Sequence, residues 1–159
     1  MSKRRDLEHL EQTRLIEFVR AINQNGWSFE PVTELDFMFA IPNGGQRNAI
    51  VAARIKAEGA LSGVPDLFLP AGRRGYHGLF VELKVGKNRP TASQREMLEK
   101  LSGAGYMTAV AYGASNALAY ILWYTGLRLT NTGRVKMAMF DFDVKLDKAG
   151  YALFPQEAK

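Results

Sequence analysis

The segment LFVELK, residues 79–84, limits what this chain can fold into more than any other segment. It is typical of a β-strand, and the apolar residues on either side of Glu82 indicate a central strand that is buried on both faces. Charges in such a place are costly unless they are paired. Side chains two residues apart on a strand share a face, so Glu82 and Lys84 lie next to each other. The chain is therefore expected to build a layered sheet with a polar site inside it.

A second carboxylate, Asp66, lies in the segment GVPDLFL. It follows Pro65 and begins an expected strand at 66–69. A glycine-rich loop over 71–78 joins this strand to the one at 79–84, which favours a hairpin. In a hairpin, Asp66 can lie close to Glu82. The two carboxylates would then face each other with the ammonium group of Lys84 beside them.

Two carboxylates at short range repel each other unless a cation joins them, and Mg²⁺ or Mn²⁺ prefers such oxygen ligands. A bound divalent cation lowers the pKa of its water and polarises a phosphate. Lys84 would orient the attacking water or stabilise the negative charge that develops on the phosphate. These are the parts that phosphodiester hydrolysis requires. The alternative is that Glu82 and Lys84 form a surface ion pair, which stabilises a protein by only about 0–1 kcal/mol.

Hydrophobic periodicity and glycine or proline breaks predict the remaining elements. The chain up to residue 126 has the order α-β-α-β-β-α-β-α, which is an α/β fold with a mixed central sheet flanked by helices. The further helices are expected at 7–24, 47–58, from Thr91 or Ser93 to about 102, and 115–125, and the further strands at 34–41 and 106–112.

The C-terminal part of the chain, residues 127–159, differs in character from residues 1–126. Residues 135–143 alternate between apolar and polar over part of their length, which predicts a β-strand. With residues 150–154 they would form a hairpin around 145–150. We therefore expect a main domain at 1–126 and a C-terminal β extension, packed either on the same domain or on a second subunit.

Composition excludes several classes of protein. The 159 residues suit one domain, and the absence of cysteine rules out disulfide frameworks, thiolate zinc sites and cysteine nucleophiles. No run of about 18 apolar residues predicts a membrane span, and the N-terminus lacks the apolar core of a secretion signal, so a cytoplasmic protein is expected. The formal net charge of +5 weakly favours an anionic partner such as nucleic acid.

Several of these features occur together, and in one order, in a known family. The chain carries Glu11 in its first helix, the turn Pro42-Asn43-Gly44-Gly45-Gln46-Arg47, the segment GVPDL at 63–67, VELK at 81–84 and Gln94 in the following helix. This ordered set, over roughly residues 7–125, resembles the VRR-NUC family of the PD-(D/E)xK nuclease superfamily. The resemblance implies a restriction-endonuclease-like core with a C-terminal β tail.

The resemblance also implies roles for individual residues. Asp66 and Glu82 match the metal-binding carboxylates, the Leu83 carbonyl completes the shell, Lys84 matches the catalytic lysine, and Gln94 supports the site. Glu11 matches a helical glutamate that would ligate the metal through water or hold a second ion, although Glu8 and Glu17 lie nearby on the same helix. The expected DNA contacts are basic or polar residues around this site: Asn43, Arg47, Arg73, Arg74, Lys87, Arg89 and Arg95.

A lone domain of this kind resembles nucleases encoded by bacteria or their phages. The resemblance implies a Mg²⁺- or Mn²⁺-dependent endonuclease for branched DNA such as Holliday junctions, acting as a homodimer in the cytoplasm of a bacterial host or phage-infected cell. The alternative function is a nucleic-acid-binding module of the same fold that does not cleave.

Overall fold

The computed structural model describes residues 3–42 and 49–155. Four strands form one mixed sheet in the order β1 (Phe39–Ala40), β2 (Leu67–Leu69), β3 (Leu79–Lys84) and β4 (Met107–Tyr112). β1 and β2 are antiparallel, β2 and β3 are antiparallel, and β3 and β4 are parallel. Every residue of β3 is buried, as its apolar sequence predicts for a central strand.

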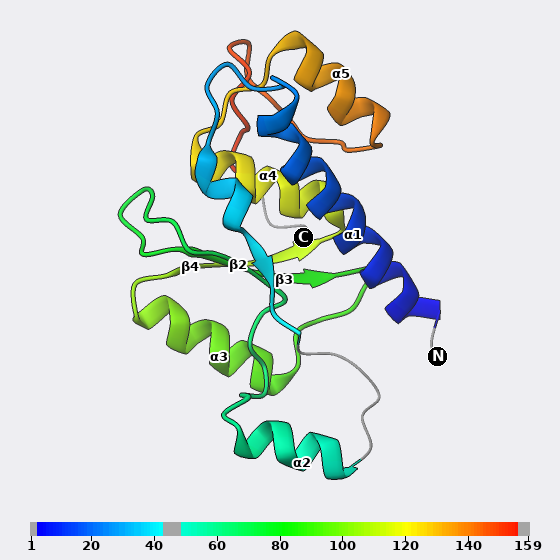
Figure 1. Ribbon diagram of the computed structural model, residues 1–159, viewed down its shortest axis with the longest axis vertical. Coiled ribbons are helices and arrows are strands. Elements are labelled where there is room, and N and C mark those ends of the chain that lie inside the picture. Colours follow the sequence, from blue (N-terminus) through cyan, green and yellow to red (C-terminus); the bar gives the residue numbers. More distant parts are fainter. Residues whose placement is uncertain (1–2, 43–48, 156–159) are drawn as a thin grey trace.

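Helices cover both faces of the sheet (Figure 1). Helices α1 (Lys3–Gln24) and α4 (Ala114–Thr125) lie on one face, and α3 (Ala92–Gly103) lies on the other. The main core lies under α1 and α4, where Leu15, Phe18 and Ile22 of α1 and Leu118 and Ile121 of α4 are fully buried. The short helix α2 (Ala49–Ala57) stands away from the sheet, below α3 in this view. The expected mixed sheet flanked by helices is thus confirmed.

The expected strand at 34–41 is wrong over most of its length. Residues Thr33–Phe37 form a 3₁₀ helix, and only Phe39–Ala40 pair with β2. Leu35 and Met38, three residues apart, are buried, whereas Phe37 and Phe39 are exposed. The buried side chains therefore follow the three-residue repeat of a 3₁₀ helix and not the two-residue repeat of a strand. The short apolar run LDFMFA fits the repeat of a strand and that of a 3₁₀ helix equally well. Packing against the rest of the protein selects the 3₁₀ helix.

The expected strand at 135–143 is also wrong, because α5 covers Asn131–Met139. The Thr130 side chain caps this helix by accepting a hydrogen bond from the Gly133 amide at 3.1 Å. Gly133 lies so close to Trp27 that a Cβ there would stand 2.0 Å from the Trp27 carbonyl oxygen. The chain does reverse near 145–150, where Leu146 and Ala152 form an isolated antiparallel bridge.

The extension packs against the rest of the same chain. Phe142 is buried with its ring 5.0 Å from that of Phe18 on α1, and Val144 and Ala152 belong to the same core as α1 and α4. Among the described residues, no helix is long and apolar enough to cross a membrane.

Candidate active site

The pairing of β2 with β3 brings the two predicted carboxylates together. Leu67 pairs with Val81, and this register continued by one residue places Asp66 beside Glu82. The Leu83 amide donates a hydrogen bond to Asp66 Oδ2 at 2.8 Å, and the Ile41 amide donates to the Asp66 carbonyl at the same distance. Asp66 is thus held from both neighbouring strands at the carboxyl end of β3.

Glu82 is fixed by two donors on one oxygen. Lys84 Nζ lies 2.6 Å from Glu82 Oε1, and Gln94 Nε2 donates to the same atom at 2.5 Å. Glu82 is fully buried, and its other oxygen, Oε2, is buried without a hydrogen-bond partner among the described residues. A buried carboxylate oxygen with no donor is an uncommon and costly arrangement that calls for a ligand. Glu82 Oε2 is therefore the atom most in need of a cation.

Gln94 reaches Glu82 because the start of α3 is fixed locally. Thr91 is the N-cap residue, and its side chain accepts a hydrogen bond from the Gln94 amide at 3.3 Å. Gln94 Oε1 in turn accepts from the Thr91 amide at 2.9 Å, which completes a capping box. Both ends of the Gln94 amide group are thus used, one for the helix start and one for Glu82.

Gly63 lets the chain leading to Asp66 run against the same helix start. It adopts a φ of +83°, and a Cβ at this position would stand 2.3 Å from the Ser93 carbonyl oxygen. A side chain here would push α3 away from the loop that precedes Asp66. The glycine of the GVPD segment therefore serves the close approach of Asp66 and Gln94 to Glu82.

Burial and mutual repulsion disturb the acidity of both carboxyls. Desolvation raises the pKa of Glu82 from 4.5 to about 7, and the charge of Asp66 acts in the same direction, against the opposing effect of Lys84. Desolvation also raises the pKa of Asp66, against the lowering effect of the Leu83 amide. The charge of Glu8 acts on both groups in the same upward direction. The protein therefore holds negative charge here at a cost in stability.

This cost predicts a specific pH dependence without added metal. Unfolded Glu82 loses its proton near pH 4.5 and folded Glu82 near pH 7. As the pH rises between these values, the unfolded state is favoured, by roughly 3 kcal/mol at most above pH 7. Glu82→Gln removes this contribution. Urea unfolding should therefore show wild type losing about 2–3 kcal/mol relative to Glu82→Gln between pH 5 and pH 8. A difference that is the same at both pH values would contradict the raised pKa.

The Glu11 carboxylate is engaged by the start of α4 and by Arg14. Its Oε2 accepts a hydrogen bond from the Ala114 amide at 2.6 Å and lies 3.0 Å from Arg14 Nη2. Among the described residues no group of three or more acidic, histidine or cysteine side chains is arranged to hold a metal ion. A role of Glu11 at the metal therefore stays a prediction.

Glu8 is the α1 residue whose charge reaches the carboxylate pair, and Asn88 Nδ2 donates to Glu8 Oε1 at 3.4 Å. The spacing of three residues places Glu8 and Glu11 on one helix face. The sequence prediction chose Glu11 and left Glu8 and Glu17 as alternatives on the same helix.

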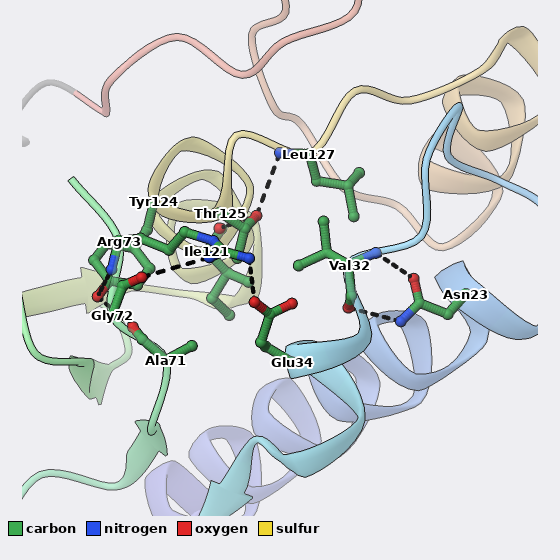
Figure 2. Close-up of polar contacts among 10 residues, drawn as sticks. All are labelled: Asn23, Val32, Glu34, Ala71, Gly72, Arg73, Ile121, Tyr124, Thr125 and Leu127. Carbon is green, nitrogen blue, oxygen red and sulfur yellow. Dashed lines mark hydrogen bonds and ion pairs between the residues drawn. The ribbon is translucent and has the colours of Figure 1, made fainter.

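The predicted DNA-contacting residues divide into two groups. Arg73 and Arg74 belong to the β2–β3 loop, at the opposite end of the sheet from the carboxylates. Arg73 forms an ion pair with Glu34, and its amide donates to the Tyr124 hydroxyl at 3.1 Å (Figure 2). Arg74 Nε donates to the Trp123 carbonyl at 2.8 Å, with its guanidinium over the Trp123 ring. Both arginines anchor the loop to the end of α4.

The second group follows β3 directly. Lys87 and Arg89 are exposed on the segment between β3 and α3, and Arg95 is exposed on α3, where its Nη1 donates to the Pro90 carbonyl at 2.6 Å. These three cations follow the carboxylate-bearing end of β3 along the chain, on the segment to α3 and on its first turn. Asn43 and Arg47 lie outside the described residues.

Comparisons with known proteins point to one family. The family model described as the VRR-NUC domain matches residues 10–115. A solved structure described as a VRR_NUC domain protein is 30% identical, with a TM-score of 0.63, over 76% of this chain and 89% of that one. No curated protein matches the sequence. The match covers most of the chain and includes Asp66, Glu82, Lys84 and Gln94. The chain therefore belongs to the VRR-NUC domain family and is a nuclease-type domain.

Proposed function

We propose that this protein is a Mg²⁺- or Mn²⁺-dependent endonuclease that hydrolyses phosphodiester bonds of DNA, with branched DNA such as a four-way junction as its preferred substrate. The observation that carries the proposal is Glu82 Oε2, a buried oxygen with no hydrogen-bond partner among the described residues, next to the carboxylate of Asp66. A hard divalent cation takes oxygen ligands and would neutralise this pair. The donor set therefore fits the cation that the family implies.

Each residue of the site has a proposed part in the reaction. Asp66 and Glu82 hold the cation, with the Leu83 carbonyl as a third ligand. When bound, the cation supplies charge neutralisation and a more acidic water. Lys84, held by Glu82 Oε1, keeps an ammonium at the site to stabilise the charge that develops on the phosphate. In the reaction, the water oxygen would bond to phosphorus as one phosphorus–oxygen bond to a sugar breaks, the water giving up a proton and the departing sugar oxygen taking one up from solvent.

The DNA path is proposed to follow the exposed cations beside the site, Lys87, Arg89 and Arg95. Contacts of this kind bind phosphates whatever the base sequence, so binding should weaken steeply with salt. Arg73 and Arg74 are already engaged with Glu34 and Trp123 at the other end of the sheet and are weaker candidates.

We also propose a homodimer, which would place two sites for paired cuts on a symmetric junction. Helix α2 projects from the body (Figure 1), and the exposed Ile50 (81%) and Leu61 (64%) lie on and just after it. Large apolar side chains exposed on a projecting element are candidates for contact with a second copy of the chain. Sedimentation equilibrium at micromolar concentration should give the mass of two chains, and the mass of one chain would contradict the dimer.

The test of the activity is a panel of end-labelled four-way, flap, single-stranded and linear duplex DNA, each incubated with Mg²⁺, Mn²⁺ or a chelator. We expect cleavage only with a divalent cation and fastest on the four-way junction. Equal cleavage rates on all forms would contradict the preference for branched DNA and leave the proposed nuclease activity standing. Binding to several forms with no cleavage in either metal would favour the non-cleaving module and overturn the nuclease.

A further inference from the structure

The Glu11 carboxylate joins helix α1 to the start of helix α4. It accepts a hydrogen bond from the Ala114 amide at 2.6 Å, at the first residue of α4, where the free amides carry a partial positive charge. Arg14 Nη2 donates to both Glu11 oxygens, at 3.1 and 3.0 Å. The carboxylate is only partly exposed, at 23%, and so is the Arg14 side chain, at 26%. Glu11 is thus fully engaged in joining two helices.

Arg14 also contacts the C-terminal extension. Its Nη1 lies 3.5 Å from Asp141 Oδ2, and its guanidinium lies over the Phe142 ring at 4.9 Å. Phe142 is buried against Phe18 of α1. Residues just after α5 therefore contact the same arginine that holds Glu11.

The other end of the connection reaches β3, the strand that carries Glu82 and Lys84. The Gly113 amide, one residue before Ala114, donates to the Lys84 carbonyl at 2.8 Å. Glu8 lies three residues before Glu11 on the same face of α1, and its charge acts on Asp66 and Glu82. Fixing Glu11 on the start of α4 therefore fixes the distance of Glu8 from the carboxylate pair.

We propose that Arg14 and Glu11 are positioning residues, which hold α1 and its Glu8 against the end of β3 and couple the C-terminal extension to the cation affinity of the site. This inference rests on the proposed function, because it concerns the same cation. It differs from the role that the sequence suggested for Glu11, which was to ligate the metal. In the role proposed here, Glu11 positions α1 and Glu8 and does not contact the metal.

The test is a titration of the whole protein with Mn²⁺ in the absence of DNA, with free Mn²⁺ followed by its paramagnetic resonance signal. The variants are Arg14→Ala, Arg14→Lys and Glu11→Gln. The control is Arg20→Ala, which removes an exposed arginine from the same helix that has no ion pair with another described residue. Circular dichroism sets a temperature at which every variant is folded. Glu11→Gln keeps an acceptor for the Ala114 amide and should therefore fold. It tests the inference if Arg14→Ala does not fold.

We expect Arg14→Ala and Glu11→Gln each to weaken Mn²⁺ binding by roughly 10-fold, the lower end for residues that orient metal ligands. Arg14→Lys should recover part of the loss, and Arg20→Ala should bind like wild type. The double variant Arg14→Ala/Glu11→Gln should be no weaker than either single change, because each single change already removes the Arg14–Glu11 ion pair. An Arg14→Ala protein that binds Mn²⁺ as tightly as wild type would overturn the inference. Absence of Mn²⁺ binding by wild type would overturn the proposed function itself.

Discussion

Replacing Lys84 by alanine is expected to lower the rate of DNA cleavage by roughly 10²–10³-fold at saturating Mn²⁺, as the loss of a preorganised charge-stabilising group does in other enzymes. The ammonium lies 2.6 Å from Glu82 Oε1 and is almost buried, so neither solvent nor a neighbouring side chain can replace it. DNA affinity should change little, because the exposed cations beside the site remain. Single-turnover cleavage of a labelled four-way junction measures the effect.

The matched control for Lys84→Ala is Lys87→Ala, which removes the same charge from an exposed position three residues later. It should weaken DNA binding and reduce its salt dependence while leaving the single-turnover rate within a few-fold of wild type. Loss of Lys84 leaves Glu82 buried without its cation, but Glu82 titrates near pH 7 and can take up a proton instead. The variant should therefore fold. A Lys84→Ala protein that cleaves at nearly the wild-type rate would remove Lys84 from the mechanism.

Replacing Asp66 by asparagine is expected to stabilise the protein and abolish cleavage together. The asparagine oxygen can still accept the hydrogen bond from the Leu83 amide that Asp66 receives at 2.8 Å. The substitution removes the desolvated charge of Asp66 and its repulsion of Glu82. We expect a gain of about 1–2 kcal/mol in the free energy of unfolding at pH 8 without metal, as when a strained functional site is relieved.

The same variant should lose the response to the cation. Wild type should gain stability when Mn²⁺ is added, because the ion binds only the folded state, and Asp66→Asn should gain much less. Urea unfolding with Mn²⁺ and with chelator gives both quantities, and Asp143→Asn, at an exposed position in the extension, is the control. If Asp66→Asn is less stable than wild type in chelator, the carboxylate pair is not strained as its raised pKa values indicate.

The centre of the fold could be predicted from sequence because local and tertiary preferences agree there. The segment at 79–84 is apolar on both faces, and the glycine-rich loop before it leaves the hairpin with β2 as the simplest pairing. That hairpin alone brings Asp66 beside Glu82. The start of α3 is expected at Thr91 or Ser93, and the structure selects Thr91, which forms a capping box with Gln94.

The errors fall where a short pattern fits two structures. The residues at 34–41 and 135–143 contain apolar side chains at spacings of both two and three, and only packing against α1 and Trp27 selects the helical forms. Glu11 could not be separated from Glu8 by sequence, because both lie on one helix face. The Ala114 amide that engages Glu11 comes from a residue 103 positions later. Such long-range partners leave no local signal.

The most direct test of the site as a metal-dependent nuclease is the cleavage of a four-way junction by wild-type protein under single-turnover conditions, with Mn²⁺ and with chelator, at pH 8. Glu82 is charged at this pH and, with Asp66, ready to hold the cation. We expect cleavage in Mn²⁺ and none in chelator. Cleavage that continues unchanged in chelator, or junction binding without cleavage in Mn²⁺, would contradict the proposed roles of Asp66, Glu82 and Lys84.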